Sequence, residues 1–251
     1  MLDLLTDASA WAALLTLTAL EIVLGIDNLV FIALLTSPLG RAHARQARAI
    51  GLSLAFVFRV LLLASLSWIM GLTEPVLSVA GAAYSWRDII LIGGGLFLIA
   101  KATREIHGEV DADAHSSGGR ARKRSLWAVV AQITVIDLVF SIDSIITAVG
   151  LVDEIEVMIA AVVISMLVMF AAARPVGGFI ERHPTTKMLA LSFLLLIGAA
   201  LIADGFHFHI PRGYIYFAMA FAAAVEVVNV IALRRRQRLK AHATAKGHGK
   251  H

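Results

Sequence analysis

The chain has 251 residues, of which 59% are apolar and 16% are charged, and its mean hydropathy is +0.83. A soluble domain has about 45–50% apolar and about 25% charged residues, so this composition excludes a soluble enzyme, a disordered chain and a secreted disulfide scaffold. The lack of cysteine excludes thiolate metal ligands and a cysteine nucleophile. We ascribe the net charge of +4 to the basic loops of a membrane protein and expect no binding of nucleic acid.

Seven stretches are long and apolar enough to cross a bilayer as helices, which takes about 20 mostly apolar residues. They are residues 10–35, 48–72, 87–104, 126–150, 154–174, 187–204 and 213–233. An all-α, polytopic membrane protein with seven transmembrane helices is therefore expected. Asp3 and Asp7 precede the first span without any Lys or Arg, so this span lacks the basic flank of a cleavable signal peptide and is expected to stay in the mature protein.

The Lys and Arg residues predict the orientation of the spans. All 22 of them except Arg59, Arg87 and Arg212 follow the first, third, fifth or seventh span. Because cytoplasmic loops carry the excess of basic residues, we expect the N-terminus outside and the C-terminus in the cytoplasm. Arg59 is unusual because it falls inside the second span.

The predicted domain organisation follows from one long loop and one internal repeat. The segment Thr18–Leu29 matches Thr134–Ile145 at a constant offset of 116 residues, with acids at corresponding places. Each half then has three spans, and because three is odd the second half enters the membrane from the opposite side. Such inverted repeats are typical of secondary transporters. The expected units are residues 1–106 (first repeat), 107–125 (flexible cytoplasmic linker), 126–206 (inverted second repeat), 207–233 (seventh helix) and 234–251 (basic cytoplasmic tail).

Four acids near the middle of the first and fourth spans are the main candidates for binding a substrate: Glu21, Asp27, Asp137 and Asp143. An Asp at the centre of a membrane helix costs about 2.5–3.5 kcal/mol on insertion scales, so these groups require partners, protons or a bound cation. Gly25 and Ser141 lie between the acids, where local unwinding would release carbonyl oxygens as further ligands. The predicted metal ligands are Glu21, Asp27, Asn28, Asp137, Asp143 and Ser144. A set of oxygen donors without sulfur favours Mn²⁺, Ca²⁺ or Mg²⁺ over Cu⁺ or a structural Zn²⁺.

Other polar residues have two interpretations each. A static buried network with Arg59 as charge partner is the alternative to a cation pathway, and Arg59 could equally serve only to orient helices. Asp204, Glu226 and Asn229 are weaker ligand candidates, because helix-end or interhelical contacts explain them equally well. The alternation Phe206-His207-Phe208-His209 is explained more simply by an aromatic belt at the outer interface than by a metal gate.

At these motifs the chain resembles the TerC family of bacterial integral membrane proteins, which includes the Alx-type manganese exporters and belongs to the wider LysE-like transporter group. The resemblance covers nearly all of residues 10–233. Its most specific pieces are Glu21-Ile-Val-Leu-Gly-Ile-Asp27-Asn28 and Asp137-Leu-Val-Phe-Ser-Ile-Asp143-Ser144. It extends to the segments His183–Lys187, Ile210–Phe221 and Glu226–Asn229. The family name comes from tellurite resistance, and the resemblance implies Mn²⁺ efflux across the bacterial inner membrane.

The expected function is export of a divalent cation, foremost Mn²⁺ as transported substrate, by alternating access in exchange for protons. Ca²⁺ or another hard cation is an alternative substrate. No ATP-binding signature and no nucleophile–base constellation is present in the sequence, so neither an enzyme nor a bound organic cofactor is expected. The partners are the metal ion, protons and the lipid bilayer, with the oligomeric state left open. The alternatives are a LysE-like exporter of a small organic or amino-acid substrate, and a non-transporting membrane partner in metal or tellurite stress.

Overall fold

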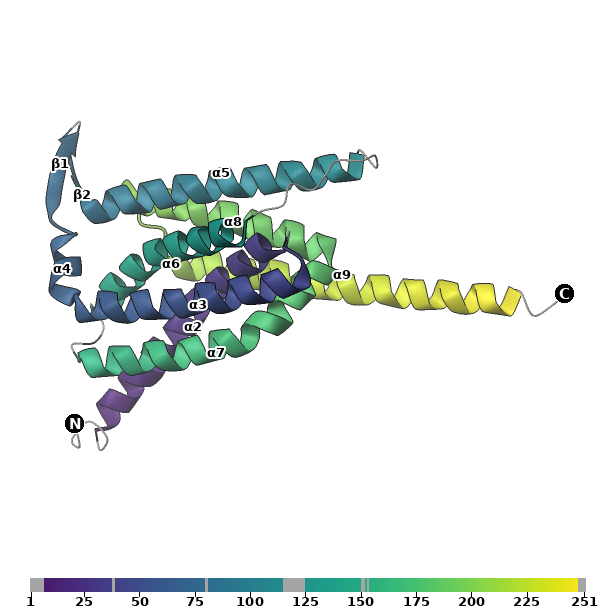
Figure 1. The fold of residues 1–251 in the computed structure, drawn as a ribbon, viewed down its shortest axis with the longest axis horizontal. Coiled ribbons are helices and arrows are strands. Elements are labelled where there is room, and N and C mark those ends of the chain that lie inside the picture. Colours follow the sequence, from purple (N-terminus) through teal and green to yellow (C-terminus); the bar gives the residue numbers. More distant parts are fainter. Residues whose placement is uncertain are drawn as a thin grey trace.

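The computed structural model of the chain describes residues 7–37, 39–79, 81–114, 125–149, 152 and 154–247. Long helices running back and forth form a single bundle, with a small hairpin and the N-terminus at one end and the C-terminus at the other (Figure 1). The elements are α2 (Ala8–Thr36), α3 (Arg41–Ala64), α4 (Leu66–Gly71), β1 (Pro75–Val79), β2 (Ala82–Ser85), α5 (Trp86–Ala114), α6 (Leu126–Val149), α7 (Ile155–Arg182), α8 (Pro184–Gly205) and α9 (Arg212–Gly247).

Six of the described helices are long and apolar enough to cross a membrane: α2, α3, α6, α7, α8 and α9. The predicted span 87–104 falls in α5, which is not among them although it has 29 residues. The reason is composition: the uncharged stretch of α5 between Asp88 and Lys101 is shorter than the roughly 20 residues that a membrane crossing requires. Six candidate spans therefore stand where the sequence predicts seven.

In the described part of the chain the fold is all-α as predicted except for one small two-stranded antiparallel hairpin. β1 and β2 pair from Val79 with Ala82 outward to Pro75 with Ser85. Gly81 in the turn has φ +86°, a left-handed conformation that glycine adopts without steric cost. The strands are too short to give a clear alternating pattern, so the sequence interpretation assigned them to a loop between two spans. The hairpin leads directly into α5 and thereby fixes where that helix begins.

Two helices extend further than predicted. α5 continues to Ala114, so residues 107–114 of the predicted linker are helical, and residues 115–124 lie outside the described part of the chain. α9 continues to Gly247 and projects beyond the bundle (Figure 1), so most of the predicted tail 234–251 is helical as well. At the other end of the chain, Asp7 caps α2: its carboxylate accepts hydrogen bonds from the side chain and backbone N–H of Ser9, which lower the pKa of Asp7.

The helices pack mainly in pairs, α2 with α7, α3 with α6 and α5 with α8. Buried apolar side chains from α2, α3, α6, α7 and α8 contribute to one large core cluster. The pair α5 and α8 lies close together at two glycines. A Cβ atom at Gly95 would lie 2.5 Å from the Gly198 carbonyl oxygen, and one at Gly198 would lie 2.9 Å from the Gly95 carbonyl oxygen. The backbones are therefore in contact where neither residue has a side chain.

Replacing Gly95 with alanine is expected to separate α5 from α8 and to destabilise the protein by about 1–3 kcal/mol, as is typical of overpacking. Thermal unfolding of the purified protein in detergent measures the effect. Gly93→Ala on the same helix is the matched control, because a Cβ atom there meets no atom within 4 Å. A Gly95→Ala variant as stable as the Gly93→Ala variant would contradict this packing.

Candidate cation site

Arg59 is the centre of a buried polar cluster that joins three helices. It projects from α3 and is only 1% exposed. Its Nη1 donates to Glu21 Oε2 of α2 at 2.5 Å, and its Nη2 lies 3.5 Å from Asp137 Oδ1 of α6. Its Nε donates to Ser141 Oγ, one turn beyond Asp137, at 3.1 Å. One guanidinium thus faces two buried carboxylates, which leaves a formal excess of one negative charge.

Asn28 completes this cluster and carries an unused acceptor. Its Nδ2 donates to Asp137 Oδ1 at 3.1 Å, while Ser141 Oγ donates to Asp137 Oδ2 at 3.3 Å. The Asn28 side chain is buried, and within the described part of the structure its Oδ1 has no hydrogen-bond partner. A buried acceptor without a partner costs about 1–3 kcal/mol, and amide oxygens are ligands for hard divalent cations.

A small pocket of about 30 Å³ lies beside Asn28. Its volume suits a water molecule or a single ion. Polar side chains line it from both sides: Asn28, Arg59, Ser144, Asp204 and Arg212. Its apolar wall consists of Leu24, Phe140, Ile197, Ala200, Leu201, Ile215 and Tyr216. The pocket therefore connects the Arg59 cluster with the polar residues near the start of α9.

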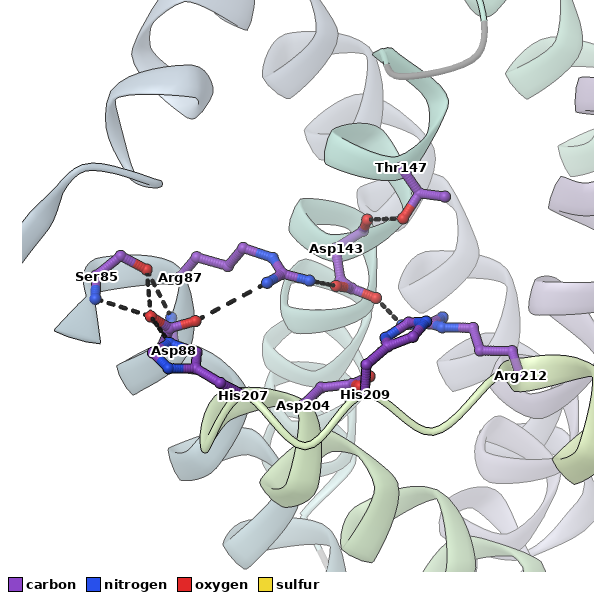
Figure 2. A network of polar contacts seen from close by, with 9 residues as sticks. All are labelled: Ser85, Arg87, Asp88, Asp143, Thr147, Asp204, His207, His209 and Arg212. Carbon is purple, nitrogen blue, oxygen red and sulfur yellow. Dashed lines mark hydrogen bonds and ion pairs between the residues drawn. The ribbon is translucent and has the colours of Figure 1, made fainter. Parts of the chain in front are cut away.

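Asp143 belongs to a second network, which Figure 2 shows from close by. Its carboxylate is 1% exposed; Oδ1 accepts from Arg87 Nη2 at 2.6 Å, and Oδ2 is paired with Arg212. Arg87 is the second residue of α5 and Arg212 is the first residue of α9. Two arginines from separate helix ends thus compensate one buried acid.

The same network ties the hairpin to the loop between α8 and α9 (Figure 2). Asp88 accepts hydrogen bonds from the backbone N–H and the hydroxyl of Ser85, both at 2.8 Å, and its Oδ2 lies 3.1 Å from His207 Nε2. The His207 ring also stacks on Tyr84, with ring centroids 5.4 Å apart. Further along the loop, His209 Nδ1 lies 3.3 Å from an oxygen of Asp204. Both histidines therefore have carboxylate neighbours.

The predicted ligands are distributed over these two networks. Glu21, Asn28 and Asp137 meet at Arg59, Asp143 lies with Arg87 and Arg212, and Ser144 lines the pocket. The side chain of Asp27 lies outside the described residues, although its backbone is helical. Among the groups that the structure describes, no three or more His, Cys, Asp or Glu side chains are arranged to hold a metal ion.

The three weaker candidates have different surroundings. Asp204 lines the pocket and faces His209. Glu226 accepts hydrogen bonds from the hydroxyls of Thr185 and Thr186, and thereby joins α9 to the start of α8. Asn229 is exposed on α9. Neither Glu226 nor Asn229 is among the residues that line the pocket beside Asn28.

The predicted unwinding at Gly25 and Ser141 is wrong, because α2 and α6 are continuous helices through both positions. Gly25 serves close packing instead: a Cβ atom there would clash with the Met169 sulfur of α7. Ser141 supplies a hydroxyl to Arg59 and Asp137. The sequence interpretation also missed the inward reach of Arg87 and Arg212, although they are the two basic residues on an otherwise acidic side of the predicted topology.

Comparisons with known proteins agree with the membrane architecture. The integral membrane protein TerC family matches residues 6–241 of the chain. The UPF0053 inner membrane protein YgdQ of Escherichia coli (strain K12) is 51% identical over 227 residues, which are 90% of this chain and 95% of that protein. A UPF0053 protein of Haemophilus influenzae is 48% identical over 230 residues, covering 92% of this chain and 97% of that protein.

Other relatives are longer than this chain. The UPF0053 inner membrane protein YoaE of Escherichia coli (strain K12) is 50% identical over 233 residues, which are 93% of this chain but 45% of that protein. The chain thus spans about half the length of this relative. No solved structure matches the chain. The family match, the two inner membrane relatives and the six membrane-length helices lead to one conclusion: the chain belongs to the TerC family of integral membrane proteins and is a multi-pass protein of the bacterial inner membrane.

Proposed function

We propose that the protein is a transporter that exports a divalent metal cation, foremost Mn²⁺, from the cytoplasm in exchange for protons. The observation that carries this proposal is the excess negative charge of the Arg59 cluster. Glu21 and Asp137 share one arginine. Asn28 donates to Asp137 and lines an ion-sized pocket, and its Oδ1 has no hydrogen-bond partner among the described residues. Carboxylate and amide oxygens are donors that hard divalent cations prefer.

The pairing of the helices supports an inverted repeat around this cluster. The repeated motif relates α2 to α6, and its offset also relates α3 to α7. If α2 is replaced by its counterpart α6, and α7 by its counterpart α3, the packed pair α2–α7 becomes the pair α6–α3. Both pairs occur in the bundle. If α5 and α8 are also counterparts, the same exchange leaves the packed pair α5–α8 unchanged. A two-fold relation of this kind is the architecture in which two halves rock around a central site.

The second network supplies a closure on the side that we expect to face outward. The ion pairs of Asp143 with Arg87 and Arg212 lie at the hairpin end of the bundle (Figures 1 and 2), opposite the basic extension of α9. In the proposed cycle these pairs hold the outer side shut while Mn²⁺ enters from the cytoplasm. They separate when the halves rock and the ion leaves.

Proton exchange supplies the energy in this proposal. Moving two positive charges outward against an inside-negative potential costs about 4.6 kcal/mol per 100 mV. Carboxylates that release Mn²⁺ can return to the cytoplasmic side protonated, which couples one flux to the other. In this proposal the buried carboxylates of Glu21 and Asp137, at 3% and 6% exposure, bind the metal ion and the protons in turn.

Mn²⁺ flux into proteoliposomes containing the purified protein tests the coupling. We expect Mn²⁺ uptake to be faster when a proton gradient drives protons out of the vesicles. An uncoupler that collapses this gradient should remove the acceleration. Protein-free liposomes under the same gradient give the background leak. Metal flux that is the same with and without the gradient would contradict proton exchange, while any protein-dependent flux would still support transport of the metal.

The size of the pocket favours an ion over an amino acid. At about 30 Å³ the pocket beside Asn28 suits an ion but is far smaller than a lysine-sized substrate. A non-transporting metal-delivery partner is distinguished by flux itself, because such a protein would bind Mn²⁺ without moving it across the bilayer. Export of Mn²⁺ is therefore the function that we put forward.

A further inference from the structure

A second cavity, of about 570 Å³, opens between α3 and α7 and shares no lining residue with the pocket beside Asn28. Three arginines line it: Arg45 and Arg48 from α3, and Arg174 from α7. The remaining wall is largely apolar, with Leu52 and Phe170 as its largest side chains. No carboxylate of the described residues lines this cavity, so we do not assign it to the proposed cation route.

The three arginines of this cavity differ in how they are held. No carboxylate among the described side chains lies within ion-pair distance of Arg45 or Arg174, and both residues are exposed. Arg48 is held in place: its Nε donates to Thr36 Oγ1 at 2.8 Å, and its guanidinium lies so close to Gly177 that a Cβ atom there would overlap it. The cavity thus presents one fixed and two adjustable guanidinium groups.

The position of the cavity relates it to the membrane surface. Arg45 and Arg48 lie in the first turns of the apolar stretch Ala42–Ala64, and Arg174 lies near the end of the apolar stretch Ile155–Ile180. The C-terminal end of α7 and the N-terminal end of α3 lie at the side of the bundle toward which α9 extends (Figure 1). If α3 and α7 cross the membrane along these stretches, we expect the arginines near the lipid headgroups of that side and Phe170, one turn before Arg174 in α7, deeper in the bilayer.

We propose that this cavity binds the phosphate group of an anionic phospholipid. Guanidinium groups bind phosphate oxygens through paired, charge-assisted hydrogen bonds, and basic pockets between membrane helices on the cytoplasmic side bind anionic headgroups. A free phosphate ion offers the same oxygens to the arginines. The apolar wall next to them favours a lipid, because an acyl chain can cover Leu52 and Phe170 while the headgroup meets the charges.

Thermal unfolding of the full-length protein in detergent tests the proposal with three additives: phosphatidylglycerol, phosphatidylcholine and inorganic phosphate. We expect phosphatidylglycerol to raise the Tm of the wild type by about 3 °C or more, and the other two to have little effect. The double variant Arg45→Gln/Arg174→Gln is expected to lose this shift. Arg104→Gln is the matched control, because Arg104 is exposed on α5 and does not line the cavity.

Three outcomes would overturn the proposal. An equal shift with phosphatidylcholine would mean that the acyl chains alone stabilise the protein. The full shift with inorganic phosphate alone would assign the cavity to a free anion. An unchanged shift in the double variant would place the lipid elsewhere on the protein. The comparison of the three additives needs only the wild type, so it stands even if the double variant does not fold.

Discussion

Replacing Arg59 with glutamine is expected to destabilise the protein by about 3–5 kcal/mol, because removing one partner leaves buried charges without compensation. Glu21 and Asp137 would then be two buried carboxylates without the arginine that faces them both. Thermal unfolding in detergent measures the effect, for which we expect a drop in Tm of about 10 °C or more.

Two further variants separate the loss of charge compensation from a general intolerance of substitution. Arg104→Gln removes an exposed arginine of α5 and should leave the Tm unchanged. Adding Glu21→Gln and Asp137→Asn to the Arg59→Gln variant removes the uncompensated acids and should recover much of the loss. If Arg59→Gln were as stable as Arg104→Gln, the arginine would not be compensating these acids.

Replacing Asp137 with asparagine should have the opposite pattern, with stability retained and transport lost. The substitution leaves Glu21 and Arg59 as a neutral pair and keeps polar atoms opposite Asn28 and Ser141. It removes the excess negative charge that, in our proposal, attracts the metal. We expect Mn²⁺ flux in proteoliposomes to fall by at least about tenfold to a hundredfold, the range found when the surroundings of a metal site are altered.

Glu105→Gln is the control for this experiment, because Glu105 is an acid of α5 that pairs with Lys101 outside both networks. Its flux should equal that of the wild type. A folded Asp137→Asn variant with normal flux would contradict the role of the excess charge and would favour a static polar network around Arg59. Comparing Tm and flux for each variant separates the two interpretations.

The sequence predicts much of the bundle and part of the candidate site. Apolar length defines α2, α6 and α8 to within a few residues. The repeated motif contains Glu21, Asn28 and Asp137, which the structure brings together at Arg59, while their role as metal ligands stays a prediction. The partners of Asp143 were not predictable in this way. Arg87 and Arg212 approach it from helix ends far apart in the sequence, so only the tertiary packing creates the network.

The other differences have local causes. α5 has 29 residues, but charges at both ends of its apolar part make that part shorter than a membrane span, so α5 is not among the candidate spans. It nevertheless packs against α8 along the bundle. The strands of the hairpin have only five and four residues, too few for a clear alternating pattern, so the sequence predicts a loop there. Hydropathy measures composition over a window, and it does not register a six-residue helix or a four-residue strand.

The most direct test of the central claim is Mn²⁺ flux in proteoliposomes, with the wild type beside Glu21→Gln and Asp137→Asn, which each remove the excess negative charge of the Arg59 cluster. Ca²⁺, Zn²⁺ and lysine serve as competitors in the same assay. The account predicts flux in the wild type that hard divalent ions inhibit and lysine does not, and loss of that flux in both variants. A wild-type protein that moves no metal under any gradient, or variants that transport as well as the wild type, would contradict it.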